Sequence, residues 1–142
     1  MTQEEKELLI KDLCARLPYG VKVSTPDDVS RTITRMNIDR NLIEVGNYID
    51  DVYVLSDIKP YLFPLSSMNR EQREEFIKFA DYEPRLEDCG RHQELYYYDL
   101  VGHENNLYPN SDAIDWLDKN LFDYRGLIEK GLANDATGLN IY

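Results

Sequence analysis

Residues 21–55 decide the fold, and they read VKVSTPDDVSRTITRMNIDRNLIEVGNYIDDVYVL. β-Branched residues are frequent in this stretch, and short polar clusters interrupt it. β-Branched residues favour extended backbone and polar clusters favour turns, so the stretch predicts strands at residues 21–23, 29–38, 42–49 and 52–55. Because short turns join neighbouring strands in antiparallel order, we expect an antiparallel meander. Both an open curled sheet and a partial barrel fit this pattern.

A helix is predicted directly before the meander. Thr2 and Glu5 have the spacing of a capping box, and leucines recur after them at helical spacing. Pro18 then stops the pattern. We therefore expect a helix over residues 2–16, with Cys14 buried on its apolar side as a small hydrophobic residue.

Two further helices are predicted after the meander. Asn69 and Ser111 are good N-cap residues, and apolar residues follow both at helical spacing, which predicts helices near residues 70–80 and 111–120. Pro-punctuated residues 58–65 are expected to form an ordered connection. Residues 81–93 and 102–110 are expected to be loops, and residues 135–142 a frayed tail or short strand. Residues 95–101 fit a strand or a helix edge, and the strand is favoured. The prediction is one α+β domain over residues 1–142.

Composition excludes several classes of protein. The 142 residues include 16 Lys+Arg and 27 Asp+Glu, a formal net charge of −11. Such a charge repels phosphate backbones, so nucleic-acid binding is disfavoured. No apolar run approaches the roughly 20 residues that span a membrane, and the acidic N-terminus does not resemble a signal peptide. With two cysteines, at positions 14 and 89, no disulfide framework is expected, and the sequence predicts a cytoplasmic protein.

The negative charge is concentrated in one third of the chain. Residues 81–123 hold 11 acidic and 3 basic residues, a net charge of −8, together with five tyrosines and the single tryptophan. Tyrosine and tryptophan suit interfaces because they combine a large rigid ring with a polar tip. One interpretation is a solvated acidic face with half-buried tyrosines. The other is an interaction surface that comprises Glu94, Tyr96, Tyr98, Asp99, Glu104, Tyr108 and Trp116.

Catalytic and metal-binding patterns are sparse. Cys89 and His92 have C-x2-H spacing, and with His103 and Cys14 they could form a Cys2His2 zinc set or a cysteine–histidine pair. The flanking sequence carries no nucleophile elbow, and the glycines form no phosphate-binding motif. The sequence therefore predicts no catalytic residues, no metal ligands and no cofactor. Among the basic residues Arg31, Arg35 and Arg40, the first two are expected on one strand face, either as solvated surface or as a local nucleic-acid patch.

Three blocks of sequence, at residues 4–21, 59–68 and 114–133, resemble a family of uncharacterised proteins from gut bacteria and their phages and mobile elements. The resemblance implies a cytoplasmic protein carried by such an element. It implies no activity and supplies no catalytic residues.

The leading functional expectation is a small acidic interaction or regulatory module without catalysis, whose partner is a basic protein. The alternative is a small enzyme or zinc-binding protein that uses Cys89, His92 and His103.

Overall fold

The computed structural model describes residues 1–46, 51–80, 85–89, 92–98, 104–106 and 111–142. The helices are α1 (Gln3–Arg16), α2 (Arg70–Ala80) and α3 (Ser111–Lys119). The strands are β1 (Lys22–Ser24), β2 (Ser30–Asn37), β3 (Leu42–Val45), β4 (Val52–Val54), β5 (Lys59–Leu62), β6 (Arg85–Cys89), β7 (His92–Tyr98), β8 (Glu104–Asn106) and β9 (Asn134–Asp135). Short 3₁₀ turns occur at Leu17–Tyr19 (η1), Leu55–Asp57 (η2) and Leu65–Ser67 (η3). The predicted α+β class is confirmed.

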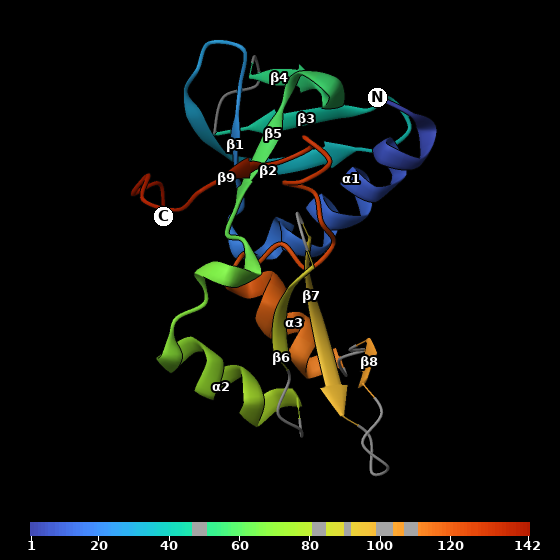
Figure 1. Cartoon of the computed structure of the whole chain (residues 1–142). Coiled ribbons are helices and arrows are strands. Elements are labelled where there is room, and N and C mark those ends of the chain that lie inside the picture. The colour runs from blue at the N-terminus through green and yellow to red at the C-terminus, as the bar shows by residue number, and fades with distance from the viewer. Residues whose placement is uncertain (47–50, 81–84, 90–91, 99–103, 107–110) are drawn as a thin grey trace.

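The predicted meander forms four neighbouring strands of a larger sheet. Its strand order is β4-β3-β2-β1-β5-β9, and the first four strands pair antiparallel in chain order. Strand β9 pairs parallel to β5, which makes the sheet mixed. Because β4 and β9 lie at opposite edges, the described strands form an open sheet and not a barrel. Figure 1 shows this sheet with α1 at one end of the molecule, and α2, α3 and the β6–β7 hairpin at the other.

Helix α1 begins as predicted. The Thr2 hydroxyl accepts a hydrogen bond from the Glu5 backbone N–H at 3.1 Å, and the Glu5 carboxylate accepts one from the Thr2 N–H at 2.7 Å. This is a complete capping box. Gly20 follows η1 with φ 72°, a left-handed conformation that glycine adopts without strain.

The buried face of α1 differs from the expected one. It runs through Leu9, Asp12, Leu13 and Arg16. The prediction that Cys14 is buried is wrong, because this residue lies one position beyond that stripe and is exposed. The sequence pattern assigned the apolar stripe to the leucines and missed that a charged pair at i, i+4 shares it.

Three predicted connections contain strands. Strand β5 lies in the Pro-punctuated segment: Pro60 pairs with Val23 of β1, and β9 begins to pair only at Tyr61. The proline therefore has a pairing partner on one side only, which a residue without N–H tolerates. Strands β6 and β8 lie in the predicted loops 81–93 and 102–110, and both pair with β7. These predictions were wrong because cross-strand pairing, and not local β propensity, extends this part of the backbone.

Among the described residues, the apolar interior consists of two clusters that meet at one aromatic pair, Phe63 and Phe122. The first lies between α1 and the sheet. The second comprises Leu65, Phe76, Ala113, Trp116, Leu117 and Phe122. Phe63 packs against both clusters, and its backbone bonds the segment after α3 through the Leu121 carbonyl and the Asp123 N–H, each at 2.8 Å. The helical end of the molecule is thereby attached to the sheet.

Tyr142 attaches the C-terminal residue to the sheet. Its hydroxyl donates a hydrogen bond to the Tyr61 carbonyl at 2.8 Å and accepts one from the Lys22 N–H at 2.9 Å. Although the residue is 46% exposed, its hydroxyl lies between two strands. Burial raises the pKa of Tyr142 from its ordinary value of 10.0 to about 12.

We expect the Tyr142 hydroxyl to titrate with a pKa of about 12 in the folded protein. Because this pKa lies above the unfolded value of 10.0, the contribution of the hydroxyl to stability is complete below pH 10 and is lost as the pH rises through about 12. The measurement is a ¹³Cζ tyrosine titration by NMR, with Tyr142→Phe to assign the resonance. Titration at the ordinary value would contradict the hydrogen bonds described above.

Among the described residues, no helix combines the length and the apolar character needed to cross a membrane.

Candidate functional site

The C-terminus of α3 fixes the direction of the chain that follows it. The Leu121 N–H donates to the Asp118 carbonyl at 3.2 Å, and the Phe122 N–H donates to the Leu117 carbonyl at 3.0 Å. This pair of bonds is a Schellman motif. Leu121 occupies the left-handed position with φ 62°, where glycine is usual. Burial of the leucine side chain in the first apolar cluster offsets this backbone cost, which is about 1 kcal/mol.

A buried ionic network joins α1 to α3, and we call Asp12, Arg16, Asp118 and Arg125 the ionic network. Asp12 accepts from Arg16 Nε at 2.9 Å and from Arg125 Nη1 at 2.7 Å. Asp118 lies 3.2 Å from the same Arg125 atom and 3.8 Å from Arg16 Nη2. Both Asp12 and Arg16 are 0% exposed. Two buried carboxylates are therefore matched by two guanidinium groups.

Arg16 also binds the C-terminal end of α3. Its Nη1 donates to the Leu117 carbonyl at 3.4 Å, and its Nη2 donates to the Phe122 carbonyl at 2.7 Å. A positive charge near a helix C-terminus is favourable because the helix dipole is negative there. Arg16 therefore connects the two helices through both charge and backbone hydrogen bonds.

Tyr124 completes the polar surroundings of the network. Its hydroxyl donates to Asp118 at 3.0 Å, and the Arg125 guanidinium lies 4.4 Å from the centre of its ring. Burial raises the pKa of the Tyr124 hydroxyl far above its ordinary value. Although burial opposes the charged form, the Asp12 carboxylate raises the pKa of Arg125. The groups of the network are thus held by one another.

The ionic network is an anchor for α3. A buried, fully paired set of charges fixes the position of the helices that carry it. Removing one partner leaves an uncompensated charge in the interior. Asp118 joins α3 to this network, and Trp116 of the same helix packs against Phe76 of α2.

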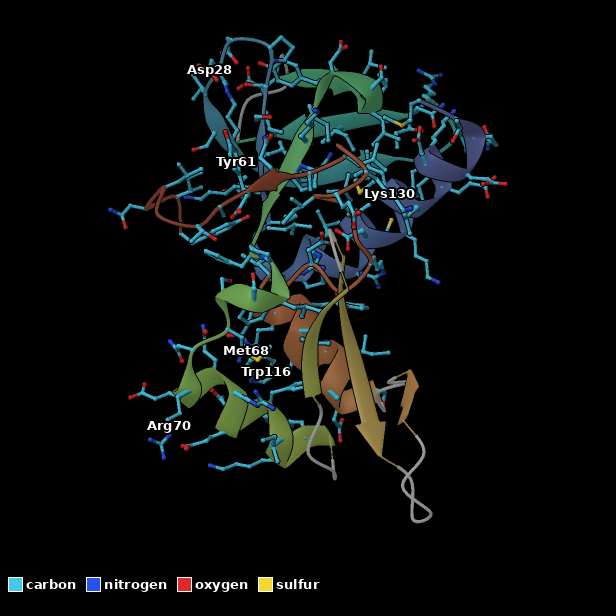
Figure 2. The ribbon with its side chains drawn as sticks, in the orientation of Figure 1. Asp28, Tyr61, Met68, Arg70, Trp116 and Lys130 are labelled. Atoms are coloured by element: carbon cyan, nitrogen blue, oxygen red, sulfur yellow. The ribbon has the colours of Figure 1, made fainter. Side chains whose placement is uncertain are left out.

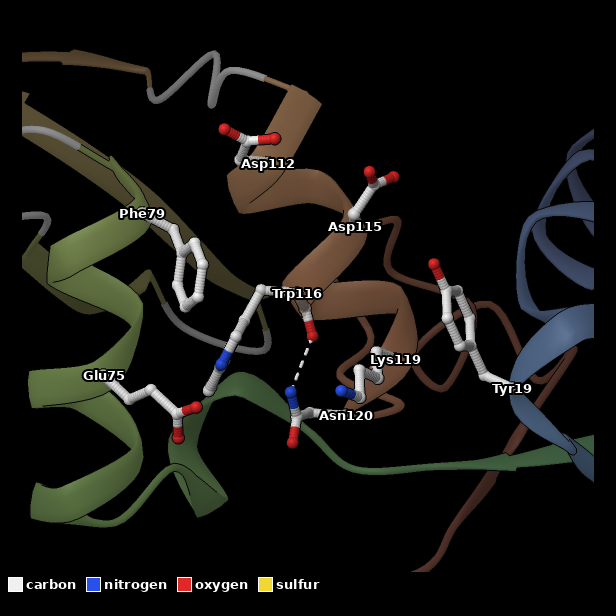
Figure 3. Close-up of a pocket in the computed structure, with 8 residues that line it drawn as sticks. All are labelled: Tyr19, Glu75, Phe79, Asp112, Asp115, Trp116, Lys119 and Asn120. Atoms are coloured by element: carbon white, nitrogen blue, oxygen red, sulfur yellow. Dashed lines mark hydrogen bonds between the residues drawn. The ribbon is translucent and has the colours of Figure 1, made fainter.

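A pocket of about 280 Å³ lies between α2 and α3 (Figure 3). We call it the α2–α3 pocket. Helix α2 contributes Glu75 and Phe79, and η1 contributes Tyr19. Helix α3 and the residue after it contribute Asp112, Asp115, Trp116, Lys119 and Asn120. Three helical segments that are distant in sequence therefore form its wall.

The pocket carries more negative than positive charge. Glu75, Asp112 and Asp115 are exposed, and none of their side chains has a hydrogen bond or ion pair to another described residue. Lys119 is the basic residue among the described lining. Carboxylates without internal partners are available to a ligand of opposite charge.

Trp116 forms the inner wall of the pocket. Its ring lies 5.7 Å from that of Phe122 in a stacked arrangement and 5.4 Å from that of Phe76. Asn120 Nδ2 donates to its carbonyl at 2.9 Å. The indole Nε1 is buried and has no hydrogen-bond partner among the described residues. Figure 3 shows the nitrogen-bearing edge of the ring on the side of the pocket where Glu75 lies.

The structure places the predicted interaction residues in different settings. Glu94, Tyr96 and Tyr98 occupy alternate positions of β7, and Glu104 of β8 is directly opposite Tyr98. Asp99 and Tyr108 lie outside the described residues. Trp116 is 5% exposed and lies at α3 on the side of α2, inside the second cluster, which differs from its expected place on an exposed face (Figure 2).

Part of the acidic charge of residues 81–123 is internal. Asp118 belongs to the ionic network, and Asp123 accepts the backbone N–H groups of Leu127 and Ile128 at 2.9 and 2.8 Å. Burial raises the pKa of Asp123, and the two N–H groups oppose that rise. The acidic groups that remain exposed on α3 are Asp112 and Asp115, and both line the α2–α3 pocket.

Sequence reasoning missed the pocket residues of α2 and the whole ionic network. The detectable signal was Asp12 and Arg16, which are four residues apart within the apolar stripe of a predicted helix. Their partners are about a hundred positions away, so sequence spacing alone could not supply them.

The cysteine and histidine residues are only partly brought together. The β6–β7 register sets Cys89 opposite His92. Cys14 is exposed on α1 with its Sγ 3.9 Å from Met36 Sδ, and His103 lies outside the described residues. In the part of the chain that the structure describes, no group of three or more potential metal ligands is found.

The strand arginines are engaged with acidic neighbours. Arg31 bonds Asp27 at 2.6 Å and Asp51 at 3.2 Å, and Arg35 lies 4.0 Å from Glu44. The β2–β3 register shifts between Ile33 and Arg35. The neighbouring carboxylates offset the positive charge that a nucleic-acid patch would need.

No family model, curated protein or solved structure matches this chain.

Proposed function

We propose that this protein is a small cytoplasmic interaction module that recognises a basic partner protein. The observation that carries this proposal is the α2–α3 pocket, in which three exposed carboxylates without described partners surround aromatic rings. The ionic network supports it, because a rigidly held α3 presents Asp112 and Asp115 in a defined geometry.

Both the net charge of the chain and the charge of the pocket lining favour a basic partner. The whole chain carries a net charge of −11, and the described lining of the pocket has three acidic residues against one lysine. Complementary charge accelerates encounter and excludes partners of the same sign. Aromatic rings beside such charges supply the contact area typical of interface centres.

Binding of the partner protein is expected to depend on the carboxylates of the α2–α3 pocket. Wild-type protein is immobilised beside a pocket variant, Glu75→Gln/Asp112→Asn/Asp115→Asn, and a control variant, Asp28→Asn/Asp39→Asn/Glu71→Gln. The control removes the same charge from exposed positions that do not line the pocket. Both variants therefore change the overall charge equally.

We expect a basic protein from a bacterial extract to bind the wild type and the control, and to bind the pocket variant at least about tenfold more weakly. Its affinity, measured with the purified partner, falls as salt rises. The resemblance to proteins of phages and mobile elements motivates the bacterial extract. Equal affinity for the pocket and control variants would contradict the proposal.

A further inference from the structure

We propose that the α2–α3 pocket receives one arginine side chain of the partner together with the peptide carbonyl beside it. This inference rests on the proposed function and specifies the chemical group that the module recognises.

The size of the pocket suits one side chain. Its volume of about 280 Å³ lies just below the range of roughly 300–1,000 Å³ that is typical of sites for whole small molecules. The pocket is formed by helical segments that are packed against the rest of the molecule, so its dimensions are set by the fold. The pocket is therefore large enough for one long side chain and small for a whole cofactor.

The charges select a cation with several donors. Glu75 lies on α2, whereas Asp112 and Asp115 lie on α3, and Figure 3 shows them on the other side of the Phe79 and Trp116 rings from Glu75. A guanidinium group has five N–H donors in a planar fork, and it can bond carboxylates on two sides at once. An ammonium group is a compact point charge that stays strongly hydrated. The two carboxylates one turn apart on α3, Asp112 and Asp115, therefore favour arginine over lysine.

The aromatic residues favour the same planar group. Phe79 and Tyr19 are 39% and 38% exposed beside the carboxylates. Guanidinium groups stack on aromatic faces and are more weakly hydrated than ammonium groups. The protein uses this arrangement internally, where the Arg125 guanidinium lies 4.4 Å from the centre of the Tyr124 ring and is bonded to carboxylates.

The Trp116 indole indicates the second part of the ligand. Its Nε1 is a buried donor without a hydrogen-bond partner among the described residues, on the edge of the ring that lies toward Glu75 (Figure 3). A buried donor without an acceptor is costly, so a ligand that supplies one gains affinity. Guanidinium offers no acceptor. A peptide carbonyl next to the arginine side chain offers one, which explains why the ligand is an arginine within a polypeptide.

The test uses N-acetyl-L-arginine N-methylamide, which contains the guanidinium and two peptide carbonyls. The lysine analogue tests charge without the planar fork, and the citrulline analogue tests shape without charge. Trp116 is the only tryptophan in the chain, so intrinsic fluorescence reports binding at the pocket wall. A ligand of this size is expected to bind with a Kd on the order of 1 mM.

We expect the arginine analogue to bind at least about tenfold more tightly than the lysine analogue, and the citrulline analogue to give no saturable change. Asp115→Asn should weaken binding at least about fivefold, whereas Glu71→Gln, an equal loss of charge on the exposed surface of α2, should not. Equal affinity for arginine and lysine, or no effect of Asp115→Asn, would overturn the assignment.

The two proposals can fail separately. In one case, binding of a partner protein depends on the pocket carboxylates, but the arginine analogue does not bind and binding protects none of the partner's arginines from chemical modification. The arginine assignment is then wrong and the proposed function stands. If the arginine analogue binds as expected but no basic protein distinguishes the pocket variant from the control variant, the proposed function is wrong and the pocket is an arginine site for another purpose.

Discussion

Replacing Arg16 with methionine is expected to lower the free energy of unfolding by about 3–5 kcal/mol. Arg16 is 0% exposed, and its loss leaves the Asp12 and Asp118 carboxylates with the single guanidinium of Arg125. The carbonyls of Leu117 and Phe122 also lose a donor. Methionine is long enough to fill much of the space, so the measured loss reflects charge and hydrogen bonding more than cavity formation.

The exposed pair Arg70–Glu74 provides a matched control. It has the same i, i+4 spacing and also joins an arginine to a carboxylate, here Glu74 in place of an aspartate, with Nε 3.1 Å from the carboxylate, but the Arg70 side chain is 91% exposed and points away from the molecule (Figure 2). Exposed pairs of this kind contribute little, so Arg70→Met should leave stability unchanged within error. Urea unfolding followed by both circular dichroism and Trp116 fluorescence measures the difference. Equal effects of the two substitutions would show that the ionic network is not the anchor of α3.

Phe122→Ala is expected to destabilise the protein by about 3–5 kcal/mol. The ring is 1% exposed, stacks on Trp116 and lies 6.3 Å from the ring of Phe63, which packs against both apolar clusters. Its removal opens a cavity at the only place described here where the two clusters share an aromatic pair. Phe122→Leu should give a smaller loss because it keeps most of the buried volume.

Phe79→Ala is the control for this substitution. Phe79 is 39% exposed near the C-terminal end of α2, so its truncation should cost roughly 1 kcal/mol or less. The same change should weaken binding of the arginine analogue, because Phe79 lines the pocket. Urea titrations separate the two substitutions, and equal losses of stability would place the junction of the two clusters elsewhere.

The parts of the fold with a local signal were predictable. The capping pairs Thr2–Glu5 and Asn69–Gln72 mark the starts of α1 and α2, and both form reciprocal hydrogen bonds. The meander was also predictable, since β-branched strands and polar turns alternate within residues 21–55. These features depend on neighbours a few positions apart.

The parts that depend on distant partners were not predictable. Strand β9 pairs with β5 across more than seventy residues, and Arg125 bonds Asp12 over 113 positions. Burial of single acidic residues was also not predictable. Asp118 was counted in the acidic surface predicted from the sequence, but it lies in the interior beside Arg16 and Arg125. Among the described acidic and aromatic side chains of residues 81–123, those of Asp112, Asp115 and Trp116 line the α2–α3 pocket.

The indole N–H resonance of Trp116 tests the central claim most directly, because the chain has one tryptophan and therefore one such signal. In a ¹H–¹⁵N correlation spectrum titrated with N-acetyl-L-arginine N-methylamide, we predict saturable shifts of this resonance and of the amides of Glu75, Phe79, Asp112 and Asp115. An indole resonance that stays in place while shifts scatter over acidic positions elsewhere on the surface would contradict a specific site between α2 and α3.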